Sequence, residues 1–340
     1  MQKTECDKGS SFVTFSDIRE GSMKAVVIYE PGGPEKLIYT EVPTPDVRPG
    51  WSLVKVMGRG INRSEIFTRN GLSPTVKFPR ILGIECVGII EKSTDEDRLP
   101  EGVKVISIMG EMGRAFDGSY AEYALLPNEQ IYPVDTELPW DVLAAIPETY
   151  YTAFGSLNNL KISENDRVLV RGGTSGVGIA FLRLIRAKYH NIYVAGSSRS
   201  ASKTEMMLAE GYDEVILESE GKLETTAGFD KTLELIGPAT LKDTFLHTNE
   251  GGIVCSTGQL GGQWYLNDFD PIFELPVNGY LTSFYSGNVD GCRLQEMLNY
   301  INEYKVAVKP EKVFALEEMQ DAHAYLDGSK SFGKVVVVNS

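Results

Sequence analysis

Residues 166–178 read DRVLVRGGTSGVG, in which a short apolar run leads directly into a glycine-rich loop. The apolar run predicts a strand, and VGIAFLRLIRAKY after it predicts a helix. Glycines at such a junction allow a tight turn, so that backbone N–H groups at the helix start can bind a pyrophosphate. Against the pattern GxGxxG, Gly173 and Gly178 take the first and third places and Ser175 the middle one. The loop therefore predicts cofactor contacts at Gly173, Thr174, Ser175, Gly176, Val177 and Gly178.

A glycine loop alone is a weak signal, so its surroundings decide its meaning. Apolar runs recur after residue 147 and are separated mostly by helical stretches: NIYVAGS (191–197), EVILES (214–219), KTLELIG (231–237), GGIVCSTG (251–258) and YLTSFYSG (280–287). Strands buried on both faces and alternating with helices are typical of a parallel, doubly wound sheet. In that context the loop indicates a dinucleotide site.

The strand after the loop bears on the choice between NAD and NADP. An NAD site needs an acid there to bind the ribose 2′-hydroxyl. This strand is followed by SRSASK, without an acid, and offers Ser197, Ser198, Arg199 and Lys203. Cations and small hydroxyls bind a 2′-phosphate by charge-assisted hydrogen bonds, so NADP is the predicted cofactor.

The chain before residue 147 differs in composition and in the pattern of its apolar residues. From Met23 it is rich in glycine and proline with short alternating apolar runs, which predicts a compact β-rich domain. Residues 1–22 are polar, and we expect them to be an expression tag or a disordered extension ahead of Met23. After Val289 two helical stretches and a terminal strand, GKVVVV, follow, and that strand is expected to return to the first domain.

Composition narrows the class of protein. The formal charge of −14 argues against nucleic acid or anionic membrane as a partner, and no uncharged segment is long enough to span a bilayer. The four cysteines include no CxxC pair, as expected for reduced thiols in a cytoplasmic protein.

Further segments occur in a familiar order: INRSEIFTRNG (61–71), ILGIECVG (81–88), GSYAEYALLP, IPETYYTAFGSL and the closing GKVVVV. Together with the glycine loop they resemble the medium-chain dehydrogenase/reductase superfamily, and within it the zinc-free quinone oxidoreductase-like branch. The resemblance implies an α/β fold with two domains. A GroES-like β-rich catalytic domain would comprise residues 23–147 plus 288–340, and a Rossmann domain with a doubly wound parallel sheet residues 148–287.

The same resemblance bears on whether the protein binds a catalytic zinc ion. Zinc-dependent members place ligands at the positions of Asn62, Ile84 and Glu148, of which Glu148 alone could bind Zn²⁺. A catalytic zinc needs three protein ligands, so we expect no metal. Glu85, between two glycines, is expected to be scaffolding with a partner such as Arg69, because a buried carboxylate needs one.

Further site residues follow from the resemblance. Asn62 could donate a hydrogen bond to the acceptor oxygen, or alternatively orient its loop. Tyr151 is a candidate proton donor, although packing is the more common use of such a tyrosine. Thr152 is expected to touch the nicotinamide, and further cofactor contacts are expected at Gly258, Phe284 and Tyr285.

Without a metal, reduction of a simple carbonyl is difficult because negative charge develops on oxygen. A conjugated acceptor spreads that charge, so we expect NADPH-dependent reduction of quinones or α,β-unsaturated carbonyls. Phe67 stands where many relatives have a tyrosine, which leaves open a crystallin-like NADPH-binding protein with little turnover. An enoyl-thioester reductase is a third reading, and nothing basic marks a channel for its carrier. The strand YLTSFYSG resembles the edge through which family homodimers form.

Overall fold

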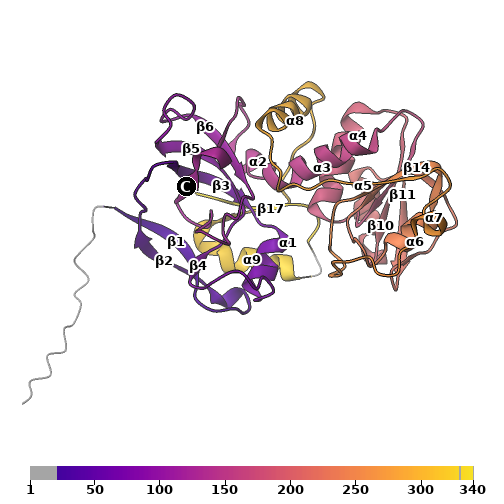
Figure 1. Cartoon of the computed structure of the whole chain (residues 1–340), viewed down its shortest axis with the longest axis horizontal. Helices are drawn as coiled ribbons and strands as arrows, with labels where there is room; N and C mark the ends of the chain where they lie inside the picture. Colours follow the sequence, from indigo (N-terminus) through magenta and orange to yellow (C-terminus); the bar gives the residue numbers. More distant parts are fainter. Residues whose placement is uncertain (1–20, 329–330, 340) are drawn as a thin grey trace, which may run out of the picture.

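The structure is a computed structural model that describes residues 21–328 and 331–339 (Figure 1). The extension expected at residues 1–22 therefore lies almost wholly outside the described residues. Within them, strand β1 begins at Ser22, just before Met23. No helix in these two ranges is long and apolar enough to cross a bilayer.

The first domain is built on strands from both ends of the chain. One sheet has the order β2-β1-β4, and the other has the order β16-β17-β3-β5-β6-β8, with β7 paired to β3. The terminal strand β17 runs antiparallel to β3, pairing Val336 with Gly60, so the expected return to the first domain is confirmed. The strands are β1 (Ser22–Ile28), β2 (Leu37–Pro43), β3 (Trp51–Gly60), β4 (Arg80–Ile81), β5 (Glu85–Lys92), β6 (Lys104–Ile108), β7 (Tyr123–Pro127), β8 (Tyr132–Pro133), β16 (Lys312–Ala315) and β17 (Val335–Val338).

Three short helices pack on the strands of this domain. They are α1 (Arg63–Arg69), α2 (Trp140–Leu143) and α9 (Met319–Asp327). Helix α1 follows β3 after Asn62, whose backbone N–H donates to Glu65 at 3.2 Å. That bond fixes the start of the helix and the position of Asn62.

The second domain is the predicted doubly wound sheet, with strand order β12-β11-β10-β9-β13-β14-β15. Except for β12 against β11, all of its strand pairs are parallel. The central strand β9 buries Val168, Leu169 and Val170 completely, as strands covered on both faces do. The strands are β9 (Arg167–Arg171), β10 (Tyr193–Ser198), β11 (Glu214–Ser219), β12 (Lys222–Leu223), β13 (Phe229–Glu234), β14 (Thr248–Ser256) and β15 (Tyr280–Ser283).

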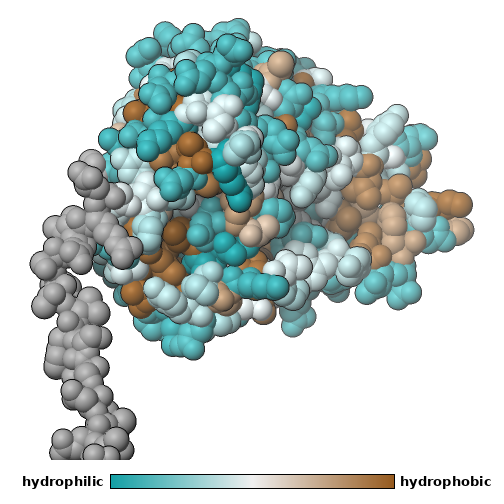
Figure 2. Space-filling model, turned by 60° about the vertical axis from the view of Figure 1, so that its left-hand side comes forward, coloured by the Kyte–Doolittle hydropathy of each residue, from teal (hydrophilic) through white to brown (hydrophobic). Residues whose placement is uncertain are grey.

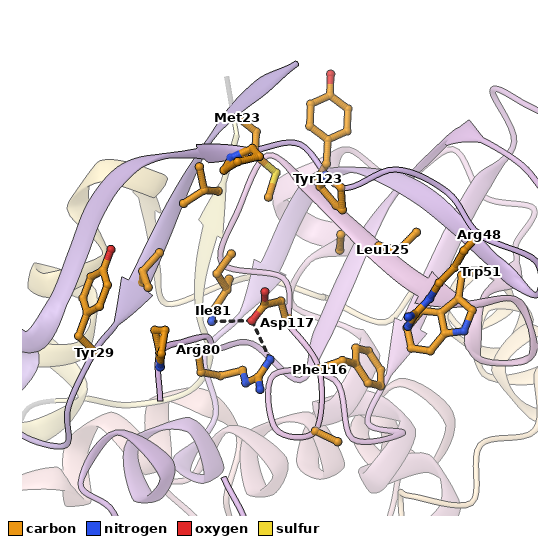
Figure 3. Close-up of a pocket in the computed structure, with 18 residues that line it drawn as sticks. Met23, Tyr29, Arg48, Trp51, Arg80, Ile81, Phe116, Asp117, Tyr123 and Leu125 are labelled. Atoms are coloured by element: carbon orange, nitrogen blue, oxygen red, sulfur yellow. Dashed lines mark hydrogen bonds and ion pairs between the residues drawn. The ribbon is translucent and has the colours of Figure 1, made fainter. Parts of the chain in front are cut away.

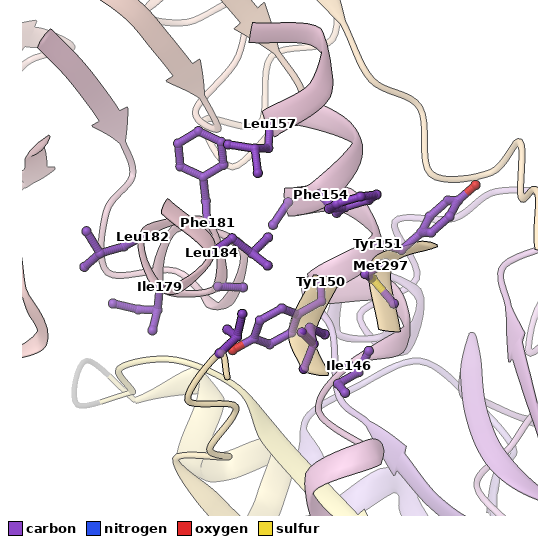
Figure 4. Close-up of a cluster of buried hydrophobic side chains, with 14 of the residues drawn as sticks. Ile146, Tyr150, Tyr151, Phe154, Leu157, Ile179, Phe181, Leu182, Leu184 and Met297 are labelled. Carbon is purple, nitrogen blue, oxygen red and sulfur yellow. The ribbon is translucent and has the colours of Figure 1, made fainter. Parts of the chain in front are cut away.

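Helices α3 (Pro147–Leu160), α4 (Gly176–Lys188), α5 (Thr204–Glu210) and α6 (Leu241–Leu246) pack on that sheet. Helix α7 (Pro271–Glu274) is joined to α6 by an ion pair, and α8 (Gly291–Glu303) packs on α3. Figure 4 shows the core between α3, α4 and α8, where Tyr150, Phe154, Phe181 and Met297 meet. Helix α8 also reaches the first domain, since the Gln295 side chain accepts from the backbone N–H of Asp135 at 3.1 Å. The domain boundary at residue 288 therefore stays a prediction.

Candidate active site

A cavity of about 1070 Å³ is lined by residues of both domains. One part of its wall is the glycine loop with the ends of β10 and β13. The opposite part is formed by α1, the start of α3 and the segment before β17. Because ligands of doubly wound sheets bind beyond the carboxyl ends of the strands, this is the candidate active site.

The glycine loop is held by Ser175, the N-cap of α4. Its Oγ accepts from the Gly178 N–H at 3.1 Å and donates to the Gly172 carbonyl at 2.8 Å. Of the six predicted loop contacts, Thr174, Ser175, Gly176 and Val177 line the cavity. Gly173 and Gly178 lie behind it. The sequence pattern did not point to Gly172, which also lines the cavity and has φ +86°.

The loop has the shape that a pyrophosphate requires. A Cβ at Gly178 would come 2.8 Å from the Gly172 carbonyl oxygen, so this glycine lets helix and loop approach each other. A Cβ at Gly176 would meet no atom nearer than 3.5 Å, because the start of α4 faces the open cavity. Backbone donors at the start of a 13-residue helix can thus reach an anion there.

The predicted 2′-phosphate residues are brought to one corner of the cavity, but they differ in availability. All four line the wall: Ser197, Ser198, Arg199 and Lys203, of which Arg199 is exposed. The Lys203 ammonium donates to the Ser331 carbonyl at 2.8 Å, and its partial burial lowers the pKa of Lys203. Ser197 is fully buried, and its hydroxyl accepts from the Gly172 N–H at 3.0 Å. It therefore holds the loop, while Arg199 is the cation best placed for a phosphate.

Glu218 is an acid in the wall of the same cavity, and it is paired with a buried guanidinium. Its carboxylate accepts from the buried Arg171 guanidinium at 3.1 Å and from the Ser197 hydroxyl at 3.3 Å. Arg171 lies at 2.9 Å from Asp243 as well. The Glu218 carboxylate is thus held in place by an ion pair whose guanidinium also lies 3.9 Å from Glu234.

At the opposite end, three side chains form a buried polar cluster around Glu85. Lys334 donates to Glu85 Oε1 and to Asn62 Oδ1, each at 2.6 Å. Asn62 Nδ2 donates to the same Glu85 oxygen at 2.8 Å. Glu85 Oε2 accepts from the backbone N–H of Glu148 at 2.6 Å. Glu85 is thus scaffolding, as expected, and it fixes Asn62, Lys334 and the start of α3 together.

The prediction that Arg69 is the partner of Glu85 was wrong. Arg69 pairs instead with Asp327 of α9 at 2.6 Å and donates to the Gly32 carbonyl at 3.1 Å. Arg69 lies at the last turn of α1, whereas Lys334 precedes β17, whose partner β3 ends beside Asn62. The sheet register, which brings the chain end to this cluster, makes Lys334 the partner.

Glu148 and Thr152 face the cavity from the first turns of α3. Glu148 Oε1 accepts from the Thr152 hydroxyl at 3.2 Å and from the Ser286 hydroxyl at 3.0 Å. Burial, and then the nearby Glu85, raise the pKa of Glu148 to about 7. The same two causes raise the pKa of Glu65 to about 7, but Glu65 lies behind the wall.

Besides Gly173 and Gly178, two further predicted site residues do not reach the cavity. Tyr151 is fully buried, and its hydroxyl donates to the Asn288 carbonyl at 3.2 Å and accepts from the Asp290 N–H at 2.9 Å. Residues 148 and 152 share a helix face, so Tyr151 points to α8. Phe284 packs over Gly155 and against Tyr151, with ring centroids 5.6 Å apart. Tyr285 and Gly258 do line the cavity, as predicted.

The acceptor end of the cavity has apolar walls. Phe67 of α1 meets Trp264 across it edge-to-face, with ring centroids 6.4 Å apart, and Leu72, Met109 and Leu260 lie around them. Sequence reasoning missed Trp264, Ser286 and Lys334. Lys334 had a signal, because it is a lone charge directly before a run of four valines.

The positions of a catalytic zinc site do not form a ligand set here. Ile84 has no lone pair, and the Asn62 amide oxygen is occupied by the Lys334 ammonium. Across residues 21–328 and 331–339, no group of three or more His, Cys, Asp or Glu converges in a way that could hold a metal. The donor set therefore does not fit Zn²⁺.

A second groove, of about 560 Å³, lies in the first domain beside β1. Figure 3 shows its apolar residues, among them Trp51, Phe116 and Tyr123, with Arg80 paired to Asp117 at 2.9 Å. The glycine loop does not line it, so it is not the nucleotide site.

The fold and the cavity define a two-domain dehydrogenase with a nicotinamide cofactor, and comparison with known proteins gives its family. Residues 48–136 match the alcohol dehydrogenase GroES-like domain family, and residues 211–337 match the zinc-binding dehydrogenase family. Quinone oxidoreductase of Rattus norvegicus is 30% identical over 250 residues, which are 70% of this chain and 74% of that protein. The chain belongs to the medium-chain dehydrogenase/reductase superfamily, in its quinone oxidoreductase-like branch.

Other similarities fit this assignment. The 2-methylene-furan-3-one reductase of Solanum lycopersicum is 25% identical over 313 residues, covering 88% of this chain and 74% of the reductase. Quinone oxidoreductase from Coxiella burnetii superposes with a TM-score of 0.76 at 21% identity over 93% of this chain and 99% of that one. A mycobacterial protein complexed with NADPH does so with a TM-score of 0.76 at 23% identity and the same coverage.

Proposed function

We propose that this protein is an NADPH-dependent, zinc-independent reductase of quinones or α,β-unsaturated carbonyl compounds. The observation that carries the proposal is the single cavity. At one end it has an anion-binding helix start and Arg199, and at the other it has apolar walls, an ammonium group and, in the part of the chain that the structure describes, no metal-ligand set. The quinone oxidoreductases and the furanone reductase among the relatives support the same substrate classes.

The preference for NADPH rests on the corner beyond β10. Its wall carries Ser198 and the exposed Arg199, and the nearby acid, Glu218, is ion-paired. Among the residues that the structure describes, a ribose 2′-hydroxyl would find no free carboxylate there, whereas a 2′-phosphate would find a guanidinium, which binds phosphate with charge-assisted hydrogen bonds.

The bound nicotinamide would supply a hydride, and the chain supplies the surroundings. Apolar walls exclude water from the acceptor. Lys334 uses two N–H bonds on Glu85 and Asn62, and its third can point to the charge that develops on the acceptor oxygen. Asn62 gives its own amide hydrogens to Glu85 and, at 3.4 Å, to Glu65, so we assign it to positioning Lys334.

NADPH oxidation with 1,4-benzoquinone, 9,10-phenanthrenequinone and a simple enone tests the proposal. Turnover that prefers NADPH to NADH and survives chelator treatment is the expected result. Tight NADPH binding without turnover on any acceptor would instead favour a crystallin-like binding protein, which the missing phenol at Phe67 favours. An enoyl-thioester reductase would require turnover on a thioester alone.

We also propose a cytoplasmic homodimer. The described cysteines, Cys86, Cys255 and Cys292, are free thiols, which fits a reducing compartment. Strand β15 is a sheet edge, and hydrophobic side chains gather at this end of the molecule (Figure 2). The exposed hydrophobic residues of β15 and of the segments before it are Leu246, Ile272, Phe273, Val277, Tyr280 and Leu281. Pairing of two β15 edges would cover this surface.

A further inference from the structure

One carboxyl oxygen of Glu148 accepts hydrogen bonds from the protein, and the other does not. Oε1 accepts hydrogen bonds from Thr152 and Ser286, at 3.2 and 3.0 Å. Oε2 is buried and has no hydrogen-bond partner within the described part of the chain. An unpartnered buried oxygen is unfavourable, so its presence in a residue that lines the cavity points to a ligand as the missing partner.

The surroundings favour a proton on that oxygen. Glu85 and Lys334 are the charged groups next to Glu148, and Lys334 is already paired with Glu85 at 2.6 Å. Glu65 adds a third carboxyl to the same buried cluster. With two hydroxyl hydrogen bonds on Oε1, the proton belongs on Oε2, where it needs an acceptor.

We propose that Glu148 is the proton donor of the reduction and delivers its Oε2 proton to the acceptor molecule. This inference rests on the proposed function. The acceptor takes up a hydride with its electron pair at the β-carbon, and the π pair of the double bond moves toward the carbonyl. The Oε2–H bond then breaks, the proton forms the new C–H bond at the α-carbon, or the O–H bond of a quinol, and the carboxylate left behind regains a proton from water.

Other acids in the wall are less suited to this role. Glu218 is tied to Arg171, and Glu111 is an exposed rim residue 4.0 Å from Arg114. Tyr151 is directed away from the cavity by its bonds to residues 288 and 290. The ammonium of Lys334 is held by two acceptors and serves better as a fixed positive charge. Glu148 also lies one helical turn from Thr152, the residue expected at the nicotinamide, so the proton is stored beside the hydride position.

The test compares Glu148→Gln with Glu65→Gln. The Glu148→Gln side chain keeps an oxygen for Thr152 and Ser286 but has no acidic proton. Glu65 is a control for the pH profile and for facial selectivity, because it is a buried carboxyl of the same cluster with the same raised pKa, yet does not line the cavity. The rate of Glu65→Gln is not part of the comparison, since Glu65 accepts from Asn62. Both variants are expected to bind NADPH with unchanged affinity, measured by nucleotide fluorescence.

Three readouts then separate the two variants. With an enone, Glu148→Gln is expected to lose about 10²-fold in kcat and to lose the fall in rate above pH 7. In D₂O the product of the wild type should carry deuterium on one face of the α-carbon, and that of Glu148→Gln on both faces, while Glu65→Gln keeps the single face. In infrared difference spectra without turnover, the protonated carboxyl band that Glu148→Gln removes should shift when NADP⁺ is added, and the band that Glu65→Gln removes should not.

Each outcome has a definite meaning. Retention of rate, pH profile and facial selectivity in Glu148→Gln would overturn the assignment. So would a Glu148 band that is absent at pH 6 or indifferent to NADP⁺. If the wild type oxidised NADPH with none of the tested acceptors, the proposed function would be refuted instead. The infrared comparison would still decide whether Glu148 presents a proton to the cavity.

Discussion

Lys334 donates a hydrogen bond of 2.6 Å to Glu85, a residue 249 positions earlier in the chain, and only 7% of the lysine side chain is exposed. Removing one partner of such a buried pair leaves the other charge uncompensated. Lys334→Met is therefore expected to lower the free energy of unfolding by about 3–5 kcal/mol. Urea denaturation at pH 7 measures this loss.

The double variant Lys334→Met with Glu85→Gln is the informative control. Glutamine keeps one oxygen, which can still accept from the Glu148 N–H, and no buried charge is left unpaired. We expect the double variant to be more stable than Lys334→Met alone. A double variant as unstable as the sum of the two single losses would mean that the two residues act independently.

Substitutions at two glycines of the loop are expected to distinguish an effect on folding from an effect on cofactor binding. Gly178→Ala places a Cβ 2.8 Å from the Gly172 carbonyl oxygen and is expected to lower the melting temperature. Gly176→Ala meets nothing nearer than 3.5 Å and should fold normally. Its methyl group would occupy the space next to the helix start, so NADPH affinity should fall about tenfold, or about 1.4 kcal/mol. Thermal denaturation and fluorescence titration check both variants, and normal NADPH binding by Gly176→Ala would place the phosphate elsewhere.

Arg199 is predicted to determine the preference for NADPH. A charge-assisted hydrogen bond contributes about 1.5–3 kcal/mol, so Arg199→Ala should weaken NADPH binding by about tenfold or more and leave NADH binding unchanged. Lys188→Ala is the matched control, since it removes one exposed cation from the far end of α4. Equal losses for both nucleotides in Arg199→Ala would refute a specific 2′-phosphate contact.

The homodimer is tested at the exposed edge strand. Leu281 lies in β15, and a lysine there would place a charge in the proposed interface of two edges. We expect Leu281→Lys to elute as a monomer in size-exclusion chromatography with light scattering, where the wild type elutes as a dimer. Leu72→Lys, an equally apolar exposed residue on the first domain, should leave the dimer intact.

Local patterns predicted the strand–loop–helix of residues 167–188 and the return of the terminal strand, because periodicity and glycine placement report on the immediate neighbours of each residue. The orientation of side chains within the site was harder to predict. Whether Tyr151 or Thr152 faces the cavity depends on how α3 is rotated against α8, which packing decides. Likewise, sequence separation gave no indication that Glu85 pairs with Lys334 and that Arg69 pairs with Asp327. These contacts follow from sheet register between distant segments.

His323 provides a prediction on pH and stability. It is fully buried between Arg69, whose guanidinium can only donate, and Tyr120, so its Nδ1 accepts at 3.2 Å and its Nε2–H donates at 2.9 Å. Burial, and then the positive charge of Arg69, lower the pKa of His323 to about 3. The unfolded chain, with a pKa of about 6.5, binds a proton that the folded chain does not. Stability is therefore complete above pH 6.5 and is lost as the pH falls from 6.5 toward 3.

The loss should be about 1.4 kcal/mol per pH unit in that window. Glu65 and Glu148, with pKa values raised to about 7, act in the opposite direction between pH 7 and 4.5, because the folded chain binds protons there first. They contribute equally to the wild type and to His323→Gln, so the difference between the two isolates the histidine. Urea midpoints at pH 7, 6, 5 and 4 should show His323→Gln less stable at pH 7 and less sensitive to acid. Parallel pH profiles would mean that His323 becomes protonated in the folded protein.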